Sequence, residues 1–148
     1  MILLYGFNRV QAQQANLSDE KAILQVVQQF FDGMEAHDTT KFGSIAVPDA
    51  YHYSVRETRD SILVGARTHA RFNKSLPGSK NVVKERLRST GVNVQIHKRI
   101  ATVWGPYDLW VNNTFSHCGV DVFTLFKTRE GWKIAAVAYS VEPEECDK

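Results

Sequence analysis

His117 and Asp121 are the residues whose types and spacing point most directly to chemistry. They lie four residues apart in 115–127, a run rich in aromatic and β-branched residues that predicts a β-strand. Alternation along a strand places both side chains on one face, with Cα atoms about 13 Å apart, so they would flank a small ligand without touching. An imidazole can transfer protons near neutral pH, and burial raises the pKa of a carboxylate. The pair is therefore a candidate for acid–base catalysis.

The same two residues also have an ordinary structural explanation. His117 would then bond to a backbone group, and Asp121 would pair with Arg86 or Arg88. Structural ion pairs and core histidines are commoner than catalytic ones. Both interpretations stay open at this point.

Aromatic side chains on neighbouring predicted strands are candidates for holding a planar organic ligand. These are Tyr53, together with Trp104 and Tyr107 on a later strand. An expected bulge at Gly105-Pro106, where proline cannot donate a ladder hydrogen bond, would change which of them face inward. Packing in a sheet core or at a dimer interface explains the same residues.

Two arginines extend the set of candidate ligand contacts. Arg67 stands at the start of a predicted helix and Arg71 follows four residues later, so either could meet a ligand carboxylate. Exposed helix charges are the commoner explanation.

Composition excludes several classes of function. The 148 residues fit one domain, and a net charge of +2 is too mild for a nucleic-acid-binding stripe. No apolar run approaches the ~20 residues of a membrane span. Clustered cysteine and histidine spacings and glycine-rich phosphate loops are also missing, so the sequence predicts neither a metal nor a cofactor.

Cys118 and Cys146 allow one disulfide or two free thiols. A hairpin about Arg129-Glu130 would place Cys118 beside Val141, and the chain after Pro143 could then fold Cys146 back to it. Such a bridge would suit an exported protein. A buried free thiol at Cys118 fits the sequence equally well.

Hydrophobic periodicity predicts the elements that must position these residues. Ser18 is the expected N-cap of a long amphipathic helix reaching about His37, with apolar residues at three- and four-residue spacing. Shorter helices are expected from Asp38 to about Ala46 and over 68–76. Strands are expected over 50–55, 62–64, 82–90, 92–111 (as one strand), 115–127 and 132–141. This order predicts an α+β fold with helices on one face of a bent antiparallel sheet.

The domain boundaries follow from the same pattern. Residues 1–17 are expected to be an N-terminal tail, and Met1–Tyr5 with the segment 10–13 resembles a signal-peptide remnant. The domain is expected over 18–142, followed by a C-terminal tail over 143–148. The favoured location is periplasmic or secreted, with cytoplasmic as the alternative.

Three segments carry a resemblance to a known family. They are the long first helix with its Phe30-Phe31 pair, the segments Trp104–Tyr107 and Ser116–Gly119, and Phe123-x-Leu125 running into Gly131–Ile134. Together they resemble the nuclear transport factor 2-like superfamily, in its SnoaL-like and "putative lumazine-binding" branch, over about residues 18–141.

The resemblance implies a cone-shaped curved antiparallel sheet wrapped around a long N-terminal helix and two shorter helices, a cystatin-like α+β barrel. It implies a pocket at the open end of the cone and adds Phe123 and Trp132 to the inward-facing, candidate ligand-binding residues. It also implies a homodimer formed through the outer face of the sheet.

Three functions remain in contention, because a shared fold does not select among them. The first is binding of an apolar or aromatic small molecule inside the cone. The second is a cofactor-free isomerase, dehydratase or cyclase in which His117 and Asp121 carry protons and Tyr107 orients the substrate. The third is a dimerising interaction module with a closed, packed cone.

Overall fold

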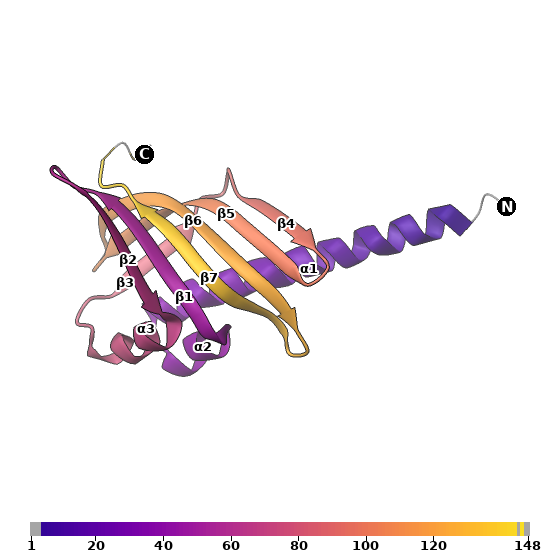
Figure 1. Cartoon of the computed structure of the whole chain (residues 1–148), viewed down its shortest axis with the longest axis horizontal. Coiled ribbons are helices and arrows are strands. Elements are labelled where there is room, and N and C mark those ends of the chain that lie inside the picture. The colour runs from indigo at the N-terminus through magenta and orange to yellow at the C-terminus, as the bar shows by residue number, and fades with distance from the viewer. Residues whose placement is uncertain (1–3, 145, 147–148) are drawn as a thin grey trace.

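The computed structural model describes residues 4–144 and 146, with side chains from Gln14 onward. A curved sheet lies over one long helix, and two short helices cover one end of it (Figure 1). The helices are α1 (Leu4–Glu35), α2 (Thr39–Ser44) and α3 (His69–Ser75). The strands are β1 (Ala46–Glu57), β2 (Ile62–Thr68), β3 (Val83–Leu87), β4 (Asn93–His97), β5 (Ile100–Val111), β6 (Thr114–Thr128) and β7 (Gly131–Val141).

The sheet has seven strands in the order β2-β1-β7-β6-β5-β3, and β4 also pairs with β5. The sheet is mixed, because β1 and β7 run parallel while the other pairs are antiparallel. It does not close into a barrel, because β2 and β3 at its two ends do not pair with each other. The expectation of a purely antiparallel sheet was wrong at this one pair. A hairpin forces antiparallel pairing, and none joins the first strand to the last.

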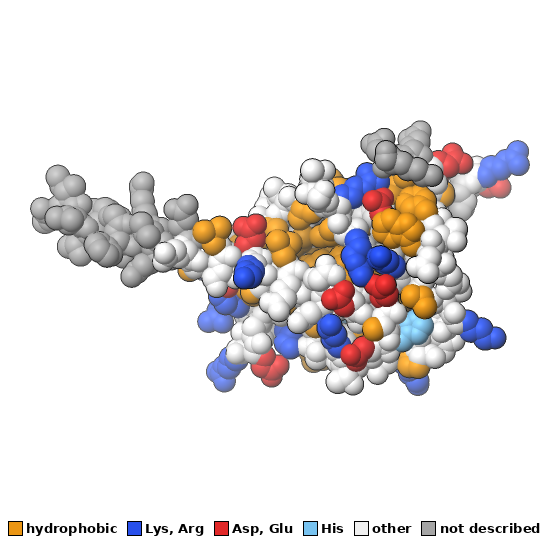
Figure 2. All heavy atoms as spheres, turned by 180° about the vertical axis from the view of Figure 1, so that it is seen from behind, with side chains coloured by type: hydrophobic (Ala, Val, Ile, Leu, Met, Phe, Trp, Pro, Cys, Tyr) orange, Lys and Arg blue, Asp and Glu red, His pale blue; other side chains and the backbone are white. Residues whose placement is uncertain are grey.

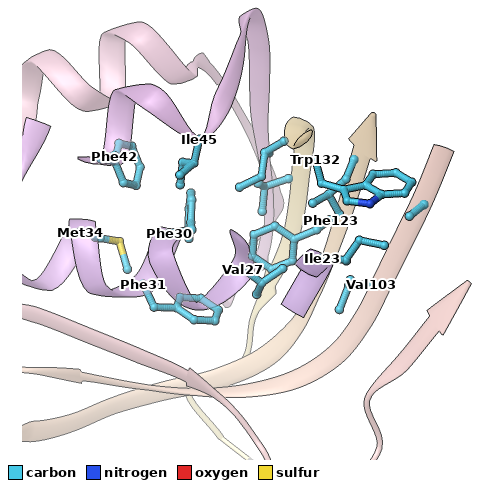
Figure 3. Close-up of a cluster of buried hydrophobic side chains, with 14 of the residues drawn as sticks. Ile23, Val27, Phe30, Phe31, Met34, Phe42, Ile45, Val103, Phe123 and Trp132 are labelled. Carbon is cyan, nitrogen blue, oxygen red and sulfur yellow. The ribbon is translucent and has the colours of Figure 1, made fainter. Parts of the chain in front are cut away.

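The core lies between α1 and the concave face of the sheet (Figure 3). The rings of Phe30 and Phe31 meet that of Phe123 on β6 edge-on, with centroids 5.4 and 5.9 Å apart. Phe30 also packs on Phe42 of α2, at 5.0 Å. The predicted phenylalanine pair therefore spans two layers, one ring reaching α2 and both reaching the sheet.

Helix α1 begins earlier than the sequence suggested. Ser18 was expected to be its N-cap, but the helix starts at Leu4, and its first half projects past the sheet as a rod (Figure 1). Residues 7–17 contain no glycine or proline and are rich in good helix formers, so nothing there stops the helix. Residues 1–3 of the expected tail lie outside the described residues.

Asp19, which directly follows the expected N-cap Ser18, joins the middle of α1 to the sheet. Its carboxylate accepts hydrogen bonds from Lys127 Nζ at 2.7 and 2.8 Å and from Trp132 Nε1 at 3.1 Å. The hydrogen bond from Lys127 is the main reason that the pKa of Asp19 lies below its usual value. The contact fixes the rotation of α1 against β6 and β7.

The short helices follow the predicted signals. Asp38 accepts from the amide of Lys41 at the start of α2, and Thr68 accepts from the amide of Arg71 at the start of α3. Arg67 consequently lies in β2, one residue before its end, rather than at the start of the helix.

The expected single strand over 92–111 is two strands. The chain turns at Lys98, which has φ 52°, so β4 folds back on β5. The bulge expected at Gly105-Pro106 is absent there, since these residues stay in register with Asp121 and Val120. The irregularity lies between Leu109 and Trp110 instead.

Candidate functional site

A cavity of about 420 Å³ opens between the concave face of the sheet, α1 and α3. Phe30 and Met34 of α1 and Phe72 of α3 supply apolar wall, and the inner face of the sheet supplies most of the polar groups. Ligand sites in proteins have this size and combine an apolar wall with polar groups.

His117 and Asp121 both line this cavity. The His117 ring meets the Tyr107 ring edge-on at 5.9 Å, and its Nδ1 lies 3.0 Å from the Ser116 hydroxyl oxygen. Burial, followed by the positive charge of Arg56, lowers the pKa of His117. The imidazole is therefore neutral near pH 7.

Asp121 is 2% exposed, and its carboxyl lies within hydrogen-bond reach of that of Glu85 on β3, which is 7% exposed, while its Oδ2 has no partner among the described residues. Two carboxyl groups can hydrogen-bond only if one of them keeps its proton. Burial raises the pKa of Glu85 to about 7 and raises that of Asp121 as well, and the neighbouring charge of Glu85 raises it further. The pair thus holds a shared proton at the cavity wall.

The structural explanation of Asp121 expected an ion pair with Arg86 or Arg88, but both arginines pair with other acids. Arg86 bonds to Glu35, and Arg88 bonds to Asp108 with Nη2 2.8 Å from Oδ1. Among the described residues, Asp121 forms no ion pair with a cation. Asp121 is inward-facing, as expected, but its partner is an acid.

Glu85 was missed because the run 84–88 reads as a charged, solvated strand face. Alternation supplied the signal: Glu85 shares a strand face with Val83 and Leu87, and all three point toward the core. A carboxylate between two apolar residues of the same parity marks a buried acid.

Tyr107 is fully buried and its hydroxyl donates to the carbonyl oxygen of Ser140 at 2.6 Å. Burial, together with the acidic pair, raises the pKa of the phenol above its ordinary value. The hydroxyl hydrogen is therefore committed to the backbone, and the expected role of Tyr107 in orienting a substrate by donating to it is dropped.

A second polar device, which the sequence did not reveal, joins His52 to His69. His69 Nε2 lies 2.7 Å from the carbonyl oxygen of Phe42, and His52 Nε2 lies 2.9 Å from His69 Nδ1. A carbonyl only accepts, so His69 carries its proton on Nε2, accepts on Nδ1, and receives the Nε2 proton of His52.

His52 consequently presents Nδ1 as an acceptor, and this buried atom has no partner among the described residues. Burial, then His69 and Arg67, lower the pKa of His52 to about 3. On β1, His52 lines the cavity, in place of the expected Tyr53.

Four aromatic candidates lie outside the cavity and are removed from the site. Trp104 and Tyr53 sit on the outer face of the sheet, 46% and 45% exposed, because Tyr107 and His52 take the inward parity. Phe123 and Trp132 are buried in the core against α1 (Figure 3).

Arg67 and Arg71 border a second cavity, of about 470 Å³, between β1, β2 and α3. The guanidinium of Arg67 lies over the Phe72 ring, 3.5 Å from its centroid. Arg67 and His52 line both cavities, so the two spaces adjoin.

Cys118 and Cys146 form a disulfide. Cys118 pairs across the sheet with Glu142, one residue beyond the expected Val141. The bridge holds the end of the chain beside β6.

The described residues carry few features of other functional classes. None of their helices is both long and apolar enough to cross a membrane. They contain no group of three or more histidine, cysteine or acidic residues placed to bind a metal ion. Basic and acidic side chains are interspersed on the face that Figure 2 shows, without a field of one sign.

Fold and cavity together define a small α+β protein with an open, ligand-sized hollow under a curved sheet. The chain belongs to the family described as "putative lumazine-binding", whose model matches residues 18–140. It has the nuclear transport factor 2-like, or cystatin-like, fold. No curated protein matches the chain.

Solved structures share this fold at low sequence identity. A nuclear transport factor 2-like protein from Novosphingobium aromaticivorans is 14% identical with a TM-score of 0.70, over 90% of this chain and 88% of its own. A superfamily protein from Salmonella enterica is 12% identical with a TM-score of 0.67, over 88% and 96%. One from Streptomyces avermitilis, described as a putative dehydratase, is 17% identical with a TM-score of 0.63, over 84% and 96%.

Proposed function

We propose that the protein binds a small, largely apolar organic molecule in the cavity under the sheet. The observation that carries this proposal is an open hollow of about 420 Å³ whose wall combines apolar side chains with polar groups, among them the unpartnered acceptor of His52 and the proton-sharing carboxyls of Asp121 and Glu85. Buried polar atoms without partners are costly in a folded protein, and a ligand would satisfy them. The family's description points to the same class of function.

The test fills the cavity from its wall. Leu109→Trp places a large ring in the cavity, while Ile100→Trp makes a matched change on the same strand, at a side chain 46% exposed. After incubation with small-molecule extract from host cells, native mass spectrometry should show an adduct on the wild type and on Ile100→Trp, but not on Leu109→Trp. An adduct retained by all three proteins, or by none, contradicts the proposal.

A second candidate function is cofactor-free acid–base catalysis, favoured by the shared proton of Glu85 and Asp121 beside the neutral ring of His117. In such a pair one carboxyl is poised to donate a proton and the other to accept one, and the imidazole is a second acceptor. One structural relative is described as a putative dehydratase.

Asp121→Asn and His117→Ala test this candidate on a panel of ketones and lactones. General acid–base catalysis predicts that Asp121→Asn lowers kcat roughly 10²–10⁴-fold, with a smaller loss for His117→Ala. No turnover by the wild type, or wild-type turnover by both variants, removes the candidate.

The third alternative was a dimerising interaction module with a closed, packed cone. The cavity of about 420 Å³ speaks against a packed cone.

We also propose that a second copy of this chain covers the outer face of the sheet. Exposed apolar side chains run across it from β2 to β5, including Val64 (74% exposed), Tyr53 and Trp104. Val122 pairs with Trp104 and continues this row on β6.

The disulfide between Cys118 and Cys146 supports a periplasmic or secreted location, where such bridges persist.

A further inference from the structure

We propose that the ligand is an organic anion, held with its charged group at Arg67 and Arg71 and its uncharged end toward Asp121. The proposal rests on the binding function above and specifies the chemical class of the molecule bound there. It comes from the two ends of the joined cavities: Arg67 and Arg71 border one, and the carboxyls of Glu85 and Asp121 lie at the other, where Arg56 also lines the wall.

The basic end lies where β2 meets α3. Arg67 and Arg71 both border the second cavity, whose wall is otherwise small or polar, with Ser54, Gly65 and Ser75. Among the described residues, neither guanidinium forms an ion pair with a carboxylate. Two guanidinium groups facing one small space suit a carboxylate or sulfonate, which they can bind with paired N–H groups.

The side chain of Arg67 is held in place by its contact with Phe72. Its guanidinium lies on the Phe72 ring, and along the sheet it pairs with His52, which the histidine relay keeps neutral. The neutral His52 therefore adds no charge, and the arginines set the sign of this end. Holding the guanidinium before binding reduces the entropy lost when it meets an anion.

The acidic end lies three strands away. From β2 the sheet runs through β1 and β7 to β6, which carries Asp121, so the two ends are separated by roughly 14 Å along the sheet. An anionic group placed against Asp121 and Glu85 would be repelled, whereas an apolar or hydrogen-bonding end would not. The polarity of the site thus selects an elongated molecule with one charged end and orients it.

Two dyes with one aromatic skeleton test the proposal. 8-Anilinonaphthalene-1-sulfonate carries a sulfonate, and N-phenyl-1-naphthylamine is the same molecule without it. Fluorescence titration of the full chain should show the sulfonate binding at least about tenfold more tightly than the neutral dye. Added salt should weaken the binding of the sulfonate dye and leave the binding of the neutral dye unchanged.

Variants separate the arginines from general charge. In Arg67→Gln/Arg71→Gln the affinity for the sulfonate should fall about tenfold and that for the neutral dye should change less than twofold. Arg67→Lys should retain part of the preference. Arg129→Gln removes an exposed arginine from the β6–β7 turn and should leave both affinities unchanged.

The two levels of the proposal fail differently. If Leu109→Trp abolishes binding of both dyes but the wild type binds them equally, or if the double arginine variant keeps the preference, the anion inference is overturned and the binding cavity stands. If Leu109→Trp changes the binding of neither dye, the cavity proposal fails and the anion inference fails with it.

Discussion

At the scale of single residues, the unusual feature is a pair of buried carboxyls that form no ion pair among the described residues. Glu85 and Asp121 come from strands on either side of β5 and meet under the sheet, where water does not stabilise their charges. Their pKa values rise mainly because of burial. A group whose pKa is higher in the folded than in the unfolded state stabilises the fold at low pH and loses that contribution as the pH rises through the folded value.

The raised pKa of Glu85 predicts how the stability of the fold changes with pH. The pKa of Glu85 is about 7 in the folded protein, so its contribution is complete below about pH 4.5 and declines through pH 7. Between pH 5 and 8 the wild type should lose roughly 1–3 kcal/mol of unfolding free energy relative to Glu85→Gln. Urea denaturation of both proteins at each pH measures the difference.

Comparing the wild type with Glu85→Gln cancels the contributions of the buried histidines, because both proteins contain them. His52, His69 and His117 have lowered pKa values, so they destabilise the fold as the pH falls, in the opposite sense. Parallel stability curves for the two proteins would contradict the shared proton.

At the scale of elements, β6 and β7 approach each other closely beside Tyr107, which lines the cavity. A Cβ on Gly119 would lie 2.1 Å from the Ser140 carbonyl oxygen and 2.8 Å from Tyr107 Cε1. The same carbonyl accepts the Tyr107 hydroxyl, and the Ser140 hydroxyl accepts from the amide of Val120. Only glycine lets the three strands meet here.

Gly119→Ala should therefore destabilise the protein by at least about 2 kcal/mol, because backbone rather than a flexible side chain must move. Gly78→Ala is the control, since a Cβ there meets nothing within 4 Å. Denaturant titration compares them. Equal stability of the two variants would show that the strands separate at little cost.

At the scale of the whole molecule, the sheet has two working faces. The concave face encloses the cavity, and the convex face exposes an apolar row that a solitary protein would leave in water. If a second copy covered this row, the cavity bordered by Arg67 and Arg71 beside α3 would lie outside the covered surface.

The proposed dimer predicts the effect of adding charge to the row. Val64→Lys/Trp104→Lys should convert a particle of twice the chain mass into a monomer in sedimentation velocity, because two buried lysines per chain would lack partners. Val82→Lys, at a site 47% exposed and outside the row, should leave the dimer intact. A monomeric wild type would contradict the proposal.

Much of the fold could be predicted from the sequence, because local signals act over a few residues. Asp38 and Thr68 are caps that need only the next turn of helix. The β5–β6 turn at Asn112-Asn113, with φ 51° and 65°, follows from residues that tolerate such angles. Helix α1 was placed too late because a strong cap at Ser18 outweighed the absence of any stop signal before it.

The site was predictable only in part. Strand parity by itself determined that His117 and Asp121 face inward, since alternation is a property of one strand. Only the tertiary structure decided their surroundings: Glu85 beside Asp121, His69 beside His52, and Arg67 at the second cavity are contacts between strands and helices distant in the chain. Periodicity assigns each side chain to a face, but the order of strands in the sheet determines which side chains on that face meet.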